Sequence, residues 1–123
     1  MTIAIDFDGT VVDHRFPEIG PDAPFAVDTL QKLVKGDHAL ILFTMRSGSF
    51  LTDAVEWFKR REILLWGVQY NPNQTVWTSS NKCFAETYID NSAFGCPLIH
   101  PPKFLHPCVD WLKVQEHFGI YPS

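Results

Sequence analysis

The segment from residue 3 to residue 10 places two carboxylates directly after a short apolar run, and it constrains the fold more than any other part of the chain. Residues 3–5 (Ile-Ala-Ile) leave no polar side, which is typical of a strand buried on both faces of a sheet. Asp6 and Asp8 follow at or just beyond the carboxyl end of this strand. Because open α/β sheets bind their ligands at that edge, we expect a functional site there.

The spacing of the two carboxylates indicates a need for positive charge. If the strand continues, its two-residue period sends the side chains of Asp6 and Asp8 to the same side. Two carboxylates held close together repel each other, so the site requires a cation, a shared proton or both. Gly9 and Thr10 add a turn whose backbone N–H groups can face an anion. This combination predicts a metal-assisted phosphoryl site.

Apolar runs alternate with helical patterns along the rest of the chain. Residues 11–21 have little helical period, and we expect them to form a small hairpin or a loop over the site. Such strand–helix units predict a three-layer, Rossmann-like α/β fold with a parallel sheet of about five strands and helices on both faces. We expect the later strands at 39–43, 64–69, 86–89 and 96–100, and helices at 24–36, from about 49, from 79 or 80, and from 106 or 107 to 119.

Length, charge and cysteine usage limit the classes of partner. The 123 residues suit a single domain, residues 1–123. A net charge of −4 argues against non-specific nucleic-acid binding, and no apolar run reaches membrane-spanning length. The three cysteines are widely spaced, which predicts free thiols in a reducing compartment. Asp6 comes too early for a signal peptide, so we expect a cytoplasmic protein.

Polar residues collect directly after the apolar runs that we expect to be strands. Asp6 and Asp8 follow the first run, Thr44 follows the second, and Asp90 follows the run at 86–89. Taken in order with Lys82, these residues resemble the four motifs of the haloacid dehalogenase superfamily. The resemblance spans most of the chain, and the spacing leaves no room for an inserted cap domain. It implies a minimal, capless phosphatase of that superfamily.

The resemblance assigns a catalytic role to each motif. It implies that Asp6 attacks phosphorus to form an aspartyl-phosphate, and that Asp8 protonates the leaving oxygen and later activates water. Thr44 and the backbone N–H of Met45 would hold the phosphoryl oxygens. Lys82 would offset negative charge on the aspartate and on the transferring group.

The same resemblance implies a Mg²⁺ ion as cofactor. Asp6, Asp90 and the backbone carbonyl of Asp8 would hold it, since Mg²⁺ prefers oxygen ligands and keeps several waters. The superfamily commonly has a second acidic residue after the fourth-motif aspartate, and here that position is Asn91. Asn91 is therefore expected either to weaken metal binding or to orient the ligands without binding metal itself.

Two residues near the motifs are candidates for substrate contact. Arg46 follows Thr44 and could clamp a second anionic group, with a surface ion pair as the alternative. His14 lies in the segment expected to form the hairpin and could touch substrate, with a solvated surface position as the alternative.

Three functions are compatible with these motifs. The first is a Mg²⁺-dependent phosphatase acting on a small phosphorylated metabolite. The second is a receiver-type signalling domain phosphorylated on aspartate, and the third is a weakly active or non-catalytic module that binds a phosphate ligand or a protein. Without a cap, a neighbouring subunit is a candidate cover for the site, so we also expect a homo-oligomer.

Overall fold

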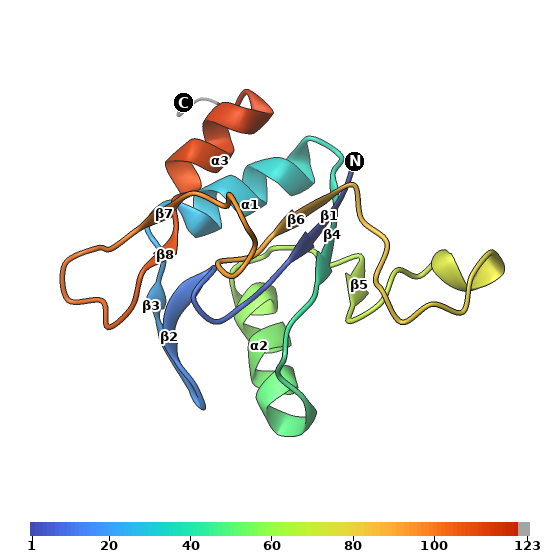
Figure 1. Ribbon diagram of the computed structural model, residues 1–123, viewed down its shortest axis with the longest axis horizontal. Coiled ribbons are helices and arrows are strands. Elements are labelled where there is room, and N and C mark those ends of the chain that lie inside the picture. Colours follow the sequence, from blue (N-terminus) through green and yellow to red (C-terminus); the bar gives the residue numbers. More distant parts are fainter. Residues whose placement is uncertain (121–123) are drawn as a thin grey trace.

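The computed structural model describes residues 1–120 as a mixed α/β fold built on a parallel sheet (Figure 1). The order of strands across this sheet is β5-β4-β1-β6, and every neighbouring pair is parallel. Numbered along the chain, this order is 3-2-1-4, the order of the first four strands of a Rossmann sheet. The strands of the sheet are β1 (Thr2–Ile5), β4 (Ala39–Leu42), β5 (Gly67–Val68) and β6 (Thr87–Ile89).

The helices pack together on one side of the sheet (Figure 1). The connections from β1 to β4 and from β4 to β5 both step toward the same edge of the sheet. Because such crossovers are right-handed, their helices, α1 (Ala26–Lys35) and α2 (Gly48–Arg60), lie on the same face. The side-chain amide of Gln31 in α1 donates to the carbonyl of Arg61, directly after α2, at 2.7 Å. The third helix, α3 (Trp111–Phe118), packs beside α1.

The opposite face of the sheet is covered by an irregular segment, residues 69–86. It contains a single turn of 3-10 helix, η1 (Gln74–Val76), in yellow on the other side of the sheet from the helices (Figure 1). The prediction of a helix from residue 79 or 80 is wrong. Short polar side chains there bond to the nearby backbone instead, as Ser80 does by accepting from the N–H of Lys82 at 3.1 Å. The expectation of helices on both faces is therefore not met within residues 1–120.

Two antiparallel hairpins lie outside the main sheet. The first joins β2 (Val12–Arg15) to β3 (Glu18–Asp22), so residues 11–21 take the first of the two forms expected for them, a hairpin and not a loop. The second joins β7 (Leu98–Ile99) to β8 (Cys108–Val109). The fifth strand predicted at 96–100 thus pairs outside the sheet, because prolines flank it and cannot donate to a longer ladder.

The core links the first motif to the C-terminal helix. The indole of Trp111, fully buried at the start of α3, donates to the carbonyl of Thr10 at 2.8 Å. This helix begins later than predicted because Asp110 caps its N-terminus, and it ends before Gly119 as expected. The buried cluster that joins sheet and helices includes Ile3, Ile5, Leu30, Leu33, Leu40, Leu42, Phe58 and Trp111.

Two sequence predictions are tested directly by the described residues. Cys83, Cys96 and Cys108 are free thiols, as their spacing predicts. Within residues 1–120, no helix has the length and apolar character needed to cross a membrane.

Candidate functional site

A cavity of about 450 Å³ opens at the carboxyl edge of the sheet. Its residues come from the ends of β1, β4 and β6 and from the β2–β3 hairpin, so segments far apart in sequence meet there. The structure therefore brings together most of the residues that the sequence singles out. They are Asp6, Asp8, His14, Thr44, Met45, Arg46, Asp90 and Asn91, with Phe16 and Ser92 completing the lining.

A tight turn after β1 sets the position of the first motif. The backbone N–H groups of Thr10 and Val11 both donate to the carbonyl of Phe7, at 3.0 and 2.9 Å. Gly9 has a φ of +81°, and a Cβ placed there would lie 2.5 Å from the nearer terminal atom of the Asn91 side-chain amide. Glycine is therefore required at this position, both for its backbone conformation and for the close approach of Asn91.

Asp6 lies where negative charge is poorly compensated. Burial and the nearby charge of Asp90 raise its pKa from the ordinary value of 3.8 to about 6. The hydroxyl of Thr10, which donates to Asp6 Oδ2 at 2.9 Å, and a hydrogen bond from the backbone of Phe7 lower this pKa but do not offset the rise. The arrangement favours a proton or a cation between the two carboxylates.

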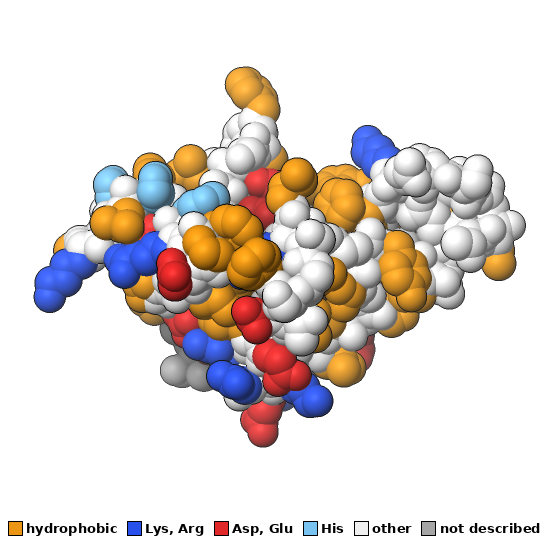
Figure 2. Space-filling model, turned by 90° about the horizontal axis from the view of Figure 1, so that it is seen from below, with side chains coloured by type: hydrophobic (Ala, Val, Ile, Leu, Met, Phe, Trp, Pro, Cys, Tyr) orange, Lys and Arg blue, Asp and Glu red, His pale blue; other side chains and the backbone are white. Residues whose placement is uncertain are grey.

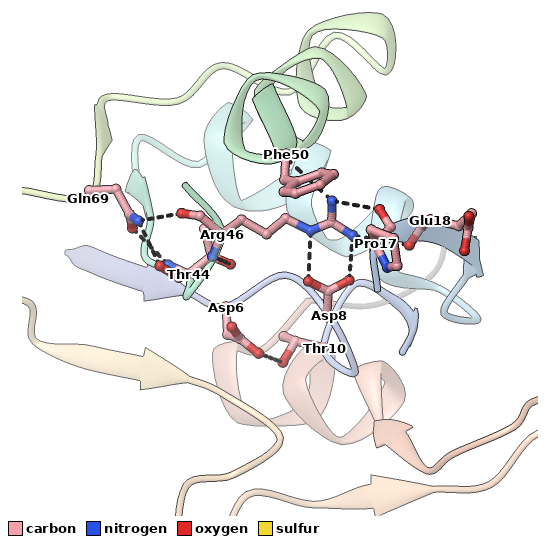
Figure 3. Close-up of polar contacts among 9 residues, drawn as sticks. All are labelled: Asp6, Asp8, Thr10, Pro17, Glu18, Thr44, Arg46, Phe50 and Gln69. Atoms are coloured by element: carbon pink, nitrogen blue, oxygen red, sulfur yellow. Dashed lines mark hydrogen bonds and ion pairs between the residues drawn. The ribbon is translucent and has the colours of Figure 1, made fainter. Parts of the chain in front are cut away.

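Asp8 forms a bidentate ion pair with Arg46 (Figure 3). The guanidinium donates from Nε and Nη2 to the two carboxylate oxygens at 2.7 and 2.8 Å, and its side chain is 1% exposed. The remaining donors bond to the carbonyls of Pro17, Glu18 and Phe50 at 3.1 to 3.3 Å. All five N–H donors of Arg46 are therefore engaged, so Arg46 holds Asp8 and the hairpin and does not serve as the expected clamp for a second anion.

Gln69 fixes the loop that follows β4, a role that sequence reasoning missed. Its side-chain amide accepts from the N–H of Thr44 at 2.8 Å and donates to the carbonyl of Thr44 at 2.6 Å (Figure 3). The hydroxyl of Thr44 accepts from the N–H of Arg46 at 3.2 Å, while the side chain of Met45 is 97% exposed. Gln69 directly follows β5 and is the last residue of the strand expected at 64–69, so its place at a strand end is the signal that could have identified it.

Asn91 joins the two carboxylates of the site through its amide. With the amide nitrogen turned toward them, it donates to Asp6 Oδ2 at 3.0 Å and to Asp90 Oδ1 at 3.3 Å. Its backbone N–H donates to the hydroxyl of Thr10 at 3.1 Å. Asn91 thus contacts both carboxylates as a donor.

Lys82 does not reach this cavity, contrary to the sequence prediction. Its ammonium lies 6.0 Å from the ring centroid of Tyr88, and the side chain lines a different hollow beside the irregular segment 69–86. The helix expected to present Lys82 does not form in this segment. Instead the amide of Gln74 holds the backbone there, donating to the carbonyl of Lys82 at 2.7 Å.

The donor set of the cavity fits a hard cation. Among residues 1–120, no group of three or more His, Cys, Asp or Glu side chains is arranged to hold a metal ion. Asp6 and Asp90 supply two carboxylates, and their mutual repulsion raises the pKa of Asp6. Backbone carbonyls and water would complete an oxygen set, which Mg²⁺ accepts more readily than metals that require a full set of side chains.

A buried carboxylate, Asp13, anchors the loop beside the cavity. It accepts from the N–H of Leu105 at 2.8 Å, from the N–H of His106 at 3.2 Å and from Nε of Arg15 at 3.0 Å. Burial alone would raise the pKa of Asp13, but these bonds outweigh burial and lower it. Its contribution to stability is thus present above the ordinary carboxyl pKa and is lost as the pH falls through the lowered value.

We therefore expect Asp13→Asn to lower the free energy of unfolding at pH 7 by about 2–4 kcal/mol, because an amide leaves a backbone donor unpaired and removes the ion pair. Urea unfolding measures this difference. The exposed Asp53, changed to asparagine, is the matched control and should change stability by less than about 0.5 kcal/mol. A wild-type midpoint for Asp13→Asn would contradict the anchoring role.

Comparison with known proteins yields a match over nearly the whole chain. No family model matches the sequence, and no curated protein matches it. A solved structure of a conserved protein from Bacteroides thetaiotaomicron matches with a TM-score of 0.80 and 36% sequence identity. The match covers 97% of this chain and 89% of that chain, so the similarity extends over the whole fold.

Proposed function

The chain belongs to the family of this conserved Bacteroides thetaiotaomicron protein, and we propose that it is a Mg²⁺-dependent phosphomonoesterase of the haloacid dehalogenase type. One observation carries the proposal: Asp6 and Asp90 converge at the ends of the adjacent strands β1 and β6, beside the oriented carboxylate of Asp8. Two half-buried carboxylates close together, one of them with a raised pKa, are typical of a metal-assisted phosphoryl site.

The order of strands favours this function over a receiver-type signalling domain. In receivers the first strand lies between the second and third strands, in the order 2-1-3-4-5. Here β1 lies between β4 and β6, which are the second and fourth strands of the sheet along the chain. The two folds therefore arrange their strand-end residues differently around the first strand.

In the proposed reaction, a carboxylate oxygen of Asp6 attacks the phosphorus atom of the substrate. The bond from phosphorus to the leaving oxygen breaks, and that oxygen takes a proton from Asp8, which must carry it on an oxygen that also accepts from Arg46. Asp8 then takes a proton from a water molecule that attacks the aspartyl-phosphate, which releases phosphate and restores the carboxylate of Asp6. Thr10 orients Asp6 throughout, and Arg46 orients Asp8.

The phosphoryl group would lie against the loop that follows β4. The hydroxyl of Thr44 and the backbone N–H of Met45 are the donors proposed for its oxygens. Mg²⁺, held by Asp6, Asp90 and the backbone carbonyl of Asp8, would neutralise the negative charge of the phosphoryl group. The side chain of Arg46 is fully engaged and Lys82 lines a different hollow, so the proposed activity should depend strongly on the metal.

A direct assay tests the function. We expect the protein to hydrolyse p-nitrophenyl phosphate with repeated turnover in the presence of Mg²⁺. Chelation with EDTA should lower the rate by at least about 100-fold, because the metal supplies most of the positive charge. Turnover that is absent under every metal condition would contradict the proposal.

A non-catalytic phosphate-binding module is the second candidate. It is favoured by the amide of Asn91 at the position of the second acid and by the distance of Lys82 from the cavity. Such a module would bind inorganic phosphate but release no product from p-nitrophenyl phosphate.

Asn91→Asp tests how the site holds its metal. The variant loses the amide that donates to Asp6 and Asp90 and adds a negative charge beside them. We expect it to bind Mg²⁺ about tenfold more tightly, and to unfold about 1–3 kcal/mol more easily in EDTA. Metal titration by calorimetry and urea unfolding measure the two effects, and unchanged Mg²⁺ affinity would place Asn91 outside the metal's environment. Asn81→Asp, in the irregular segment 69–86 away from the cavity, is the control and should change neither quantity.

A further inference from the structure

Two histidines form a pair beside the cavity, and one of them, His14, lines it. His14, on β2, lines the cavity together with Asp6 and Asp8. The ring of His106 packs edge-on against the ring of His14, with 5.6 Å between centroids. Nδ1 of His106 lies 3.1 Å from the carbonyl oxygen of His14, and because a carbonyl only accepts, this nitrogen carries the proton.

Hydrogen bonds between the hairpin and the 100–107 loop hold this pair in place. Asp13, which is fully buried, accepts from the N–H of His106 and thereby fixes the 100–107 loop against the hairpin. Arg15 adds a second link by donating from Nη2 to the carbonyl of Lys103 at 3.2 Å. The position of His106 beside His14 is therefore built by the fold and does not depend on flexible surface side chains.

Acidic and basic side chains both lie in and beside the cavity. The carboxylates of Asp6 and Asp90 line the cavity, and so does His14, whose ring contacts His106 outside this lining. Arg15, which is paired with Asp13, links this part of the hairpin to Lys103. Figure 2 shows histidine side chains gathered on one side of this face, with Lys and Arg side chains next to them. In a chain of net charge −4, this grouping provides donors that the proposed reaction does not use.

An apolar side chain lies in the same cavity. Phe16, next to His14 at the tip of the hairpin, packs edge-on against Phe50 of α2 with 5.2 Å between centroids. A short carbon skeleton could contact this ring while its two ends reach the carboxylates and the histidines.

We propose that the His14–His106 pair binds a second anionic group of the substrate, so that the preferred substrates are phosphomonoesters carrying a carboxylate or a second phosphate. This inference rests on the proposed function, and it assigns the substrate class of that site. His14 and His106 are specificity residues that take no part in the proton transfers.

Matched substrate pairs test this assignment. We expect kcat/KM to be roughly tenfold higher for 3-phosphoglycerate than for glycerol 3-phosphate if the group is a carboxylate, since hydrogen bonds to charged groups have about that effect. The same preference for fructose 1,6-bisphosphate over fructose 6-phosphate would identify a second phosphate. His14→Gln and His106→Gln should each reduce the preferred ratio toward one, mainly through KM. His117→Gln, on the exposed side of α3, should leave the ratio unchanged.

Binding without turnover separates this inference from the proposed function. In NMR titrations of the 123-residue protein, we expect the imidazole signals of His14 and His106 to shift with 3-phosphoglycerate or fructose 1,6-bisphosphate. They should shift much less with glycerol 3-phosphate or fructose 6-phosphate, which carry only one anionic group. A protein that shows these shifts but hydrolyses nothing would contradict the phosphatase proposal and support the anion site. Active enzyme with equal kcat/KM within both pairs, or ratios unaffected by His14→Gln, would overturn the anion site.

Discussion

Replacement of Asp6 by asparagine is expected to abolish phosphatase activity while stabilising the protein in the absence of Mg²⁺. An amide oxygen is too weak a nucleophile to attack phosphorus, so turnover should fall at least about 1,000-fold. Steady-state assays with p-nitrophenyl phosphate measure this loss. Acid-quenched wild-type enzyme should also contain an aspartyl-phosphate that the variant lacks.

The gain in stability follows from the pKa of Asp6. Because the folded-state pKa is raised from 3.8 to about 6, the folded protein binds the proton more tightly than the unfolded chain does. This carboxyl therefore costs the wild type stability as the pH rises from 3.8 to about 6, and the full cost remains above that window. We expect Asp6→Asn to raise the free energy of unfolding at pH 7.5 by about 2 kcal/mol, and by little at pH 4.

Urea unfolding in EDTA at the two pH values checks this prediction. Saturating Mg²⁺ should reduce the difference between the proteins, since the metal binds the folded wild type and stabilises it. Asp53→Asn serves again as the exposed control and should show no pH-dependent difference. A variant less stable than wild type at pH 7.5 would contradict the destabilising effect of the Asp6 charge, and wild-type turnover in the variant would contradict its role as nucleophile.

Replacement of Arg46 by methionine is expected to destabilise the protein more than any other single substitution in the cavity. The substitution leaves the carboxylate of Asp8, whose side chain is 11% exposed, without its bidentate partner. It also removes the donors to the carbonyls of Pro17, Glu18 and Phe50. Removing one partner of a buried ion pair costs about 3–5 kcal/mol, and we expect a loss of this size together with loss of activity.

A matched pair elsewhere in the fold provides the control. Arg61 forms a similar bidentate pair with Asp22, at 3.0 and 3.1 Å, but the two side chains are 30% and 39% exposed. Arg61→Met should cost only about 1 kcal/mol, because water screens this pair. A double-mutant cycle with Asp8→Asn and Arg46→Met should give a coupling energy of at least about 1 kcal/mol. Equal losses in the free energy of unfolding for Arg46→Met and Arg61→Met would contradict the claim that burial makes the Asp8–Arg46 pair the stronger one.

The sequence predicts the parts of this site that depend on local pattern. The apolar run before Asp6 identifies β1 and its polar end, and the same reasoning places Thr44 and Asp90 at the same edge of the sheet. Parallel strands guarantee that these ends meet, whatever the intervening loops do. The C-terminal end of α3 at Gly119 also follows from a short-range signal, whereas the pattern of residues 11–21 leaves a hairpin and a loop open.

The parts that fail depend on distant partners. Asp8 lies 38 residues from Arg46, so nothing in the sequence indicates that the guanidinium would pair with it and not with substrate. The prediction that Lys82 reaches the site depends on the order of the motifs alone. In the structure the backbone around Lys82 is held by Gln74, and no local pattern indicates that Gln74 is buried. The direction of the Asn91 amide is likewise fixed by two carboxylates from different strands.

The contacts of Arg46 also determine how substrate can enter. Its bonds to the carbonyls of Pro17 and Glu18 fasten the tip of the hairpin to the loop after β4. Lifting the hairpin would break two hydrogen bonds from a charged donor, at about 1.5–3 kcal/mol each, so the raised form would be rare. We therefore expect the hairpin to remain in place, and the substrate and product of the proposed reaction to exchange by diffusion without its movement. If the protein is the proposed phosphatase, its catalytic cycle should need no opening of this hairpin, and kcat should report on the chemistry and on product departure.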